Sequence, residues 1–287
     1  MREHRFGPEH VLWAFEAGVE PAYTVEPGEV FVVETMDALG GVVRKGMTEK
    51  PQVERANPAT GPIAVRGAQP GQVLAIDILR IDLLGEGYLT FGGKPRFFEQ
   101  AGGLIPFRSD ILLPAAPMIG TIGVMPANGA FNNSIAGDYG GNMDTRDVAA
   151  GATLYLTTQV PGGLLAMGDV HATQGDGETS GQGIETAAEI TLRVRILPKG
   201  LSSRPYLARG GELMIIVTAE TLDQAAKQAV EEMALLITRH SPLSYDEARM
   251  LLGQVGDLRV GQIVNPLKTI RMAISLTTVP WNSPLAL

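Results

Sequence analysis

Short apolar runs separated by turn signals dominate the first two thirds of the chain. Runs at residues 30–33, 63–65 and 73–79 lie next to proline-glycine pairs at 27–28 and 70–71. Proline and glycine favour turns, and short apolar runs between turns are typical of β-strands. The pattern therefore predicts a β-rich body.

The run at residues 73–79 also alternates between apolar and polar positions. Leu74, Ile76 and Ile78 share one face of an extended chain, because the side chains of a strand repeat every two residues. Asp77 points to the opposite face, which we expect to contact solvent.

The pattern changes to a helical period near residue 220. Thr221 is a suitable N-cap for a first helix. The apolar positions at helical spacing are Leu222, Ala225, Ala226, Ala229, Val230, Met233, Leu236 and Ile237. Ser244 and Glu247 form a capping box before a second amphipathic helix, which we expect to end near residues 253–256. A last apolar stretch follows at residues 269–279.

Together these elements predict a mainly β protein with two C-terminal helices, α+β overall. We expect residues 1–219 to form a β-rich body that carries the functional site. Residues 220–287 are expected to form a helical hairpin and a final strand that pack on this body and do not fold independently.

Composition narrows the possible functions. The chain has 287 residues, is 45% hydrophobic, carries a formal charge of −8 and contains no cysteine. No basic run is present to bind nucleic acid, and disulfides, cysteine-ligated zinc and thiol nucleophiles are excluded. No apolar run approaches the roughly 18 residues of a membrane span, and residues 1–9 do not resemble a signal peptide, so we expect a cytoplasmic protein.

Two glycine-rich segments contain the candidate chemistry. They read G-D-Y-G-G-N-M-D-T-R-D at residues 137–147 and G-D-V-H-A-T-Q-G-D-G-E at residues 168–178. Residues two apart on an extended chain point to the same side. Such pairs are Asn142 with Asp144 and Asp169 with His171. We expect these four side chains to converge.

This residue set suits a hard or borderline divalent ion, which accepts carboxylate, carbonyl and imidazole ligands. The histidines are His4, His10, His171 and His240, and only His171 lies among carboxylates. A bound ion lowers the pKa of a coordinated water from about 15.7 to about 7. Glu178 or Asp176 is then placed to act as general base and to return the proton to a leaving group.

Structural interpretations of the same residues remain open at this point. Asp176-Gly177 and Gly140-Gly141 are common turn pairs, and a single histidine is often only hydrogen-bonded. Other enzyme motifs are absent: there is no G-x-S-x-G, and Gly92-Gly93-Lys94 is followed by proline, unlike a phosphate-binding loop.

Several motifs are similar to those of the acetamidase/formamidase family. They are E-T-M-D-A at residues 34–38, N-P-A-T-G-P-I-A-V-R-G-A-Q-P-G at 57–71, P-M-I-G-T-I-G-V-M-P-A at 117–127, G-G-N-M-D-T at 140–145 and the long segment at 168–178. The chain resembles this family over most of its length.

The resemblance implies a hydrolase that splits small aliphatic amides into a carboxylate and ammonia. It also implies a β-sandwich-like fold with additional β structure, a homo-oligomer (a dimer or higher), and a divalent metal such as zinc or calcium. The family's polar positions fall on Asp37, Asn142, Asp144, Asp169, His171, Asp176 and Glu178.

From both lines of reasoning we expect a metal-dependent amidase. Asn142, Asp144, Asp169 and His171 are predicted to hold or orient the metal, and Glu178 to act as general base. Asp37 and Asp176 are predicted to orient substrate or water. Two alternatives are a hydrolase of lactams or other carbon-nitrogen bonds with the same site, and a non-enzymatic β-sandwich ligand-binding module with a structural cation.

Overall fold

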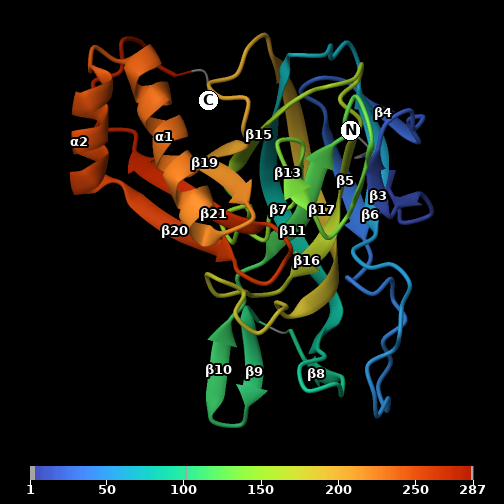
Figure 1. The fold of residues 1–287 in the computed structure, drawn as a ribbon. Helices are drawn as coiled ribbons and strands as arrows, with labels where there is room; N and C mark the ends of the chain where they lie inside the picture. The colour runs from blue at the N-terminus through green and yellow to red at the C-terminus, as the bar shows by residue number, and fades with distance from the viewer. Residues whose placement is uncertain (1–3, 101, 286) are drawn as a thin grey trace.

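The computed structural model describes residues 4–100, 102–285 and 287 (Figure 1). The strands before residue 115 are β1 (His4–Phe6), β2 (Val11–Leu12), β3 (Ala14–Glu16), β4 (Tyr23–Val25), β5 (Val30–Thr35), β6 (Ala59–Val65), β7 (Val73–Leu89), β8 (Arg96–Phe98), β9 (Leu104–Arg108) and β10 (Ile111–Pro114). The later strands are β11 (Met118–Val124), β12 (Ala130–Asn132), β13 (Ala136–Gly137), β14 (Gly140–Asn142), β15 (Thr153–Thr157), β16 (Leu165–His171), β17 (Glu185–Leu197), β18 (Tyr206–Arg209), β19 (Glu212–Ala219), β20 (Asp257–Gln262) and β21 (Lys268–Ser275).

Most of these strands belong to one large, curled and mainly antiparallel sheet. The long strands β7 and β17 pair along almost their whole length, and β17 also pairs with β5 and β16. On one side, β16 pairs with β11, and β11 pairs with β14. On the other side of β7 the sheet continues in the order β15, β18, β19, β21 and β20. The hairpin of β9 and β10 projects from this body (Figure 1).

Two hydrophobic cores lie on opposite faces of β7. Leu74, Ile76 and Ile78 contribute to the core of the β-rich body, whereas Val73 and Ala75 contribute to a second core beneath the C-terminal helices. The expected alternation of β7 is therefore present, but both of its faces are covered by protein.

The expectation that Asp77 is solvated is wrong. Its side chain is buried, and it accepts hydrogen bonds from Arg193 and Arg195 of β17 and from Thr153 of β15. Burial raises the pKa of Asp77, but the hydrogen bonds from Arg195, Thr153 and Arg193 outweigh burial, so the net pKa is lowered.

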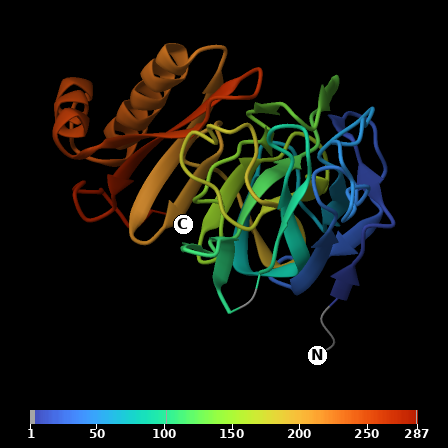
Figure 2. The ribbon, with the colours of Figure 1, turned by 90° about the horizontal axis from the view of Figure 1, so that it is seen from below.

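Two helices pack side by side at the C-terminal end, where α1 lies over β19 and β21 (Figures 1 and 2). Helix α1 (Leu222–His240) begins after the N-cap Thr221, and α2 (Tyr245–Val255) begins after Ser244 with its capping box complete. The prediction of a mainly β protein with two C-terminal helices is thus confirmed. Neither helix has the length and apolar character that a membrane crossing requires.

Candidate metal centre and active site

The centre of the candidate site lies on the hairpin formed by β16 and β17. His171 at the end of β16 is the strand partner of Glu185 at the start of β17, and Asp169 lies two residues before His171. All residues of β16 are buried, because β6 and β11 flank this strand. The site is therefore built on the interior of the sheet and not on an exposed loop.

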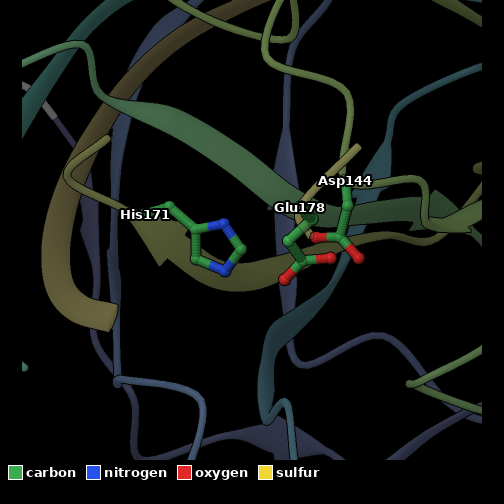
Figure 3. A group of neighbouring side chains, drawn as sticks. All are labelled: Asp144, His171 and Glu178. Carbon is green, nitrogen blue, oxygen red and sulfur yellow. The ribbon is translucent and has the colours of Figure 1, made fainter. Parts of the chain in front are cut away.

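Two groups of possible metal ligands share one imidazole. Asp144, His171 and Glu178 form the first group, and Asp169, His171 and Glu185 form the second. In Figure 3 the His171 ring and the carboxyl groups of Asp144 and Glu178 face a common space. The Nε2 atom of His171 lies 3.6 Å from Asp169 Oδ1 and 3.3 Å from Glu185 Oε2.

Unsatisfied oxygens support a cation in this space. Three buried carboxylate oxygens have no hydrogen-bond donor among the described residues: Asp144 Oδ1, Glu178 Oε2 and Glu185 Oε2. The last of these faces His171 at 3.3 Å without meeting hydrogen-bond geometry. Buried charges normally require a partner, and carboxylate oxygens with one imidazole nitrogen match the donors of a divalent metal. The residues present therefore fit such an ion.

Gln174 determines which nitrogen of His171 faces this space. The Gln174 side-chain amide donates to the carbonyl oxygen of Asp144 at 2.9 Å, so its own oxygen must be the group that lies 2.7 Å from His171 Nδ1. Nδ1 then carries a proton and donates it to Gln174. Nε2, on the opposite edge of the ring, is left as the nitrogen available to a metal.

Two neighbouring polar residues contact the Asp169 side chain, and a third contacts one of these two. Its Oδ2 accepts from Asn57 at 3.0 Å and lies 3.3 Å from the Thr121 hydroxyl. The same hydroxyl lies 2.7 Å from Asn142 Oδ1. Asn142 therefore contacts the candidate centre through Thr121, and it is not part of either ligand group.

Asp144 is positioned by the C-terminal sheet. Asn265, in the connection between β20 and β21, donates to Asp144 Oδ2 at 2.8 Å, which leaves Oδ1 as the unpaired oxygen. Gly120 makes room beside it, because a Cβ at this position would lie 2.6 Å from Asp144 Oδ1. The position of the Asp144 carboxylate thus depends on Asn265, which is 121 positions away in the chain.

Asp176 and Asp37 lie outside both ligand groups. Asp176 accepts from the buried Arg271 of β21 at 2.8 Å. Asp37 accepts from the hydroxyl of Tyr88 at 2.8 Å, and Tyr88 is the strand partner of Glu185. Asp37 is therefore connected to the centre through Tyr88.

Backbone strain is concentrated at the site. Among the described residues, the non-glycine positions with positive φ are Asn57, Asp144, Leu164, Asp169 and Glu178. Asp144, Asp169 and Glu178 belong to the ligand groups, and Asn57 donates a hydrogen bond to Asp169. Strained conformations of this kind occur frequently at functional sites, where the surrounding structure maintains them.

Burial and charge crowding shift the ionisation of this cluster. Burial raises the pKa of Glu178 to about 7, with a further increase from the charge of Asp169, although His171 opposes it. Burial and the charges of Glu178 and Asp169 also raise the pKa of Asp144. Burial alone would lower the pKa of His171, but Glu185 and Asp169 raise it overall. A cation would relieve this repulsion among carboxylates.

Four residues at the site are not among those predicted from the sequence: Glu185, Gln174, Asn265 and Arg271. Glu185 had a usable signal, because it is an acidic residue at the start of a strand that continues as T-A-A-E-I-T-L. Pairing the segments at residues 165–171 and 185–197 as a hairpin would have placed Glu185 opposite His171. Asn265 and Arg271 lie in another part of the chain and gave no local signal.

A cleft of about 340 Å³ leads to the site from the surface. The polar residues Thr173, Gln174, Asp176 and Glu178 are among those that line it. A larger cavity of about 590 Å³, which includes Gly18, Arg66 and Gly162, contains no residue of the two ligand groups. The cleft beside Glu178 is therefore the relevant one for chemistry.

The fold and site together define a class: a mainly β protein with a buried carboxylate-histidine centre at the base of a surface cleft. The chain belongs to the acetamidase/formamidase family, whose sequence pattern matches residues 8–105 and 127–212. The resemblance predicted from the motifs is thereby confirmed.

Individual relatives agree with this assignment. The crystal structure of an acetamidase from Bacillus halodurans is similar to the chain at 36% identity, with a TM-score of 0.92 over 95% of this chain and 97% of that one. A formamidase of Methylophilus methylotrophus is 24% identical in an alignment that covers 62% of this chain and 61% of that protein. The chain thus spans about three fifths of the length of that relative and of a related protein of Schizosaccharomyces pombe.

Proposed function

We propose that the protein hydrolyses the carbon-nitrogen bond of amides at the buried centre, with a divalent cation held by its carboxylates and His171. The observation that supports this most directly is the pair of ligand groups that share His171 and contain three carboxylate oxygens without a donor. Family membership gives the reaction class. Water adds to the acyl carbon, the carbon-nitrogen bond breaks, and ammonia leaves as the carboxylate forms.

In this proposal Asp144, Asp169 and His171 hold the cation, as the sequence predicted, and Glu185 joins them. Asn142 accepts from the Thr121 hydroxyl, which lies 3.3 Å from Asp169, and so helps to position the polar surroundings of this ligand. When bound, the cation supplies a water of lowered pKa, near 7, and polarises the substrate carbonyl.

Glu178 is proposed as the general base. It is the only residue of the two ligand groups that also lines the cleft, and burial raises its pKa to about 7. A carboxyl group with a pKa near the working pH both accepts a proton from water and returns it to the departing nitrogen.

Asp176 and Asp37 are proposed as positioning residues. Asp176 holds the segment that precedes Glu178 to β21 through Arg271, and Asp37 orients Tyr88 beside the strand that begins at Glu185. Neither residue needs to touch the substrate in this arrangement.

We propose zinc over calcium as the cation. Calcium takes six to eight oxygen ligands, whereas zinc accepts imidazole together with carboxylate. His171 belongs to both ligand groups, so any cation there meets a nitrogen ligand.

The first experiment measures ammonia release from formamide, acetamide and propionamide by the purified protein. Activity is measured as purified, after chelation, and after addition of Zn²⁺, Ca²⁺ or Mn²⁺. Loss on chelation and recovery with Zn²⁺ is the expected result. Hydrolysis of a lactam but of none of these amides would favour the alternative carbon-nitrogen hydrolase, and ligand binding without any hydrolysis would favour the binding module.

The protein is further proposed to form a homo-oligomer. The hairpin of β9 and β10 exposes Leu104, Ile111 and Leu112, and covering such side chains stabilises an assembly. Light scattering is expected to give a multiple of the 30.5 kDa chain mass. A monomeric mass at micromolar concentration would contradict this.

A further inference from the structure

The cleft beside Glu178 has one apolar wall that the proposed chemistry does not use. The hairpin of β9 and β10 contributes Phe107, Leu113 and Pro114 to this wall. The neighbouring strands contribute Leu89 and Ile184. A cleft lined by an ionisable group and by apolar side chains is suited to a ligand that has one polar and one apolar part.

This wall is packed directly against the strands of the site. Phe107 and Leu113 lie against a small hydrophobic core that includes Ala172 and Ile184. Ala172 follows His171 in sequence, and Ile184 precedes Glu185. The distance between the wall and the candidate centre is therefore fixed by packing.

The side chain of Phe107 is also held in place from behind. Its ring stacks with that of Phe98 at a centroid separation of 5.7 Å and an interplanar angle of 6°. The guanidinium carbon of Arg96 lies 4.8 Å from the Phe107 ring centre and 5.0 Å from that of Phe98. Arg96 also donates a hydrogen bond to the carbonyl oxygen of Phe107. A wall supported in this way is preorganised to bind a ligand.

The size of the cleft exceeds the need of the smallest amides. Its volume of about 340 Å³ lies within the range of roughly 300–1,000 Å³ of sites for larger ligands. The acyl side of formamide carries no carbon, and that of acetamide carries one methyl group. Formamide and acetamide therefore offer the apolar side chains of the cleft no more than one methyl group.

We propose that Phe107 and Leu113 select the acyl group, and that the preferred substrates are primary amides with a branched or aromatic acyl group. The inference rests on the proposed function. The acyl group packs against the hairpin wall, the amide lies at Glu178, and water cleaves the carbon-nitrogen bond to give the carboxylate and ammonia.

The test compares kcat/KM for formamide, acetamide, isobutyramide and benzamide. Each additional buried carbon in an apolar pocket changes kcat/KM by about tenfold or more. We expect isobutyramide or benzamide to exceed acetamide by at least about tenfold. Equal or higher kcat/KM for formamide and acetamide would overturn the inference while leaving the proposed amidase function intact.

Matched variants distinguish the effect of the apolar wall on kcat/KM from that of the rest of the hairpin. Phe107→Ala and Leu113→Ala are expected to lower kcat/KM for the preferred bulky amide about tenfold and to change that for acetamide less than about twofold. Asp110→Ala is the control, because Asp110 is exposed in the turn of the same hairpin and does not line the cleft. An equal loss for all substrates would mean that the wall is only structural, and would contradict the proposal.

Binding provides a second measurement if no amide is hydrolysed. Calorimetry with benzamide is then expected to show binding that Phe107→Ala weakens and Asp110→Ala does not. That outcome would reject the proposed function and retain the cleft as a site for apolar acyl groups. Absence of both hydrolysis and binding would reject both.

Discussion

Glu178 combines three properties that rarely occur together in one carboxylate. It is buried, it has a strained backbone with a φ of 46°, and one of its oxygens has no donor among the described residues. Together with its place at the cleft, these properties make it the residue whose replacement is most informative.

Glu178→Gln is expected to lower kcat for amide hydrolysis by about 10²–10⁴-fold, because an amide cannot accept the proton from water. Metal content, measured by elemental analysis, is expected to stay close to that of the original protein, since Asp169, His171 and Glu185 remain. The control is Glu189→Gln, which changes a carboxylate on the following strand β17 that pairs with Arg5 at the surface. Full turnover in Glu178→Gln at unchanged metal content would show that another group is the base.

Asp77 gives a pH-dependent contribution to stability. Its folded-state pKa is lowered by Arg195, Thr153 and Arg193 against the effect of burial. The ionised form therefore stabilises the folded state above the unfolded pKa of about 3.9, and this contribution is lost as pH falls through the folded pKa. Asp77→Asn is expected to reduce the free energy of unfolding by about 1–2 kcal/mol at pH 7, since both arginines are partly exposed.

Urea unfolding of the Asp77→Asn variant at pH 7 and at pH 3 checks this prediction, and the difference from the original protein should shrink at the lower pH. Asp82→Asn on the same strand β7 is the control, because Asp82 pairs with Arg80 at the surface. We expect this control to change stability by less than about 0.5 kcal/mol. A constant difference across the pH range would contradict the role given to the Asp77 charge.

At the scale of elements, β21 and its connection to β20 complete a site that lies mainly on other strands. Arg271 of β21 donates to Asp147 and Asp176, and Asn265 donates to Asp144. The backbone amide of Gly177 donates to the carbonyl oxygen of Gly261, which ties the segment before Glu178 to the end of β20. The C-terminal sheet thus acts as a support for the glycine-rich loop.

Arg271→Met is expected to reduce the free energy of unfolding by about 3 kcal/mol, because it removes a buried cation that pairs with Asp147 and Asp176, while Arg209 remains beside Asp147 at 3.4 Å. Chemical denaturation measures the loss. Arg259→Met on β20 serves for comparison, since Arg259 is 26% exposed where it pairs with Glu212, and a smaller loss is expected. Equal losses would show that burial of the Arg271 ion pairs is not the cause.

At the scale of the whole molecule, the centre connects segments from all parts of the chain. Asn57, Thr121, Asp144, His171 and Asn265 contact one another or a shared carboxylate. A bound cation would therefore stabilise the fold as a whole, because the unfolded chain does not assemble these ligands.

Removal of the metal is accordingly expected to lower the melting temperature. A cation present at about 100 times its dissociation constant contributes roughly 2.7 kcal/mol, which corresponds to about 4–5 °C for a chain of this length. Differential scanning calorimetry before and after chelation measures the shift. His171→Gln, which lacks the nitrogen common to both groups, should show no shift on chelation, and an equal shift in this variant would place the stabilising ion elsewhere.

The sequence by itself determined those helices and strands whose patterns lie within a few neighbouring residues. The caps Thr221 and Ser244 fixed where the two helices begin, and alternation with turn residues indicated the strands. The segment at residues 168–178 located the centre of the site, since Asp169, His171 and Glu178 are close together in the chain as well as in space.

Tertiary structure alone decided which distant residues complete that site and what covers each face of a strand. Asp77 is buried because β15 and β17 bring Thr153, Arg193 and Arg195 beside it. Glu185 faces His171 only in one register of the β16–β17 hairpin, and Asn265 reaches Asp144 only because β21 is paired into the sheet. Pairing register and sheet order depend on the packing of the whole chain, and no short segment of sequence contains that information.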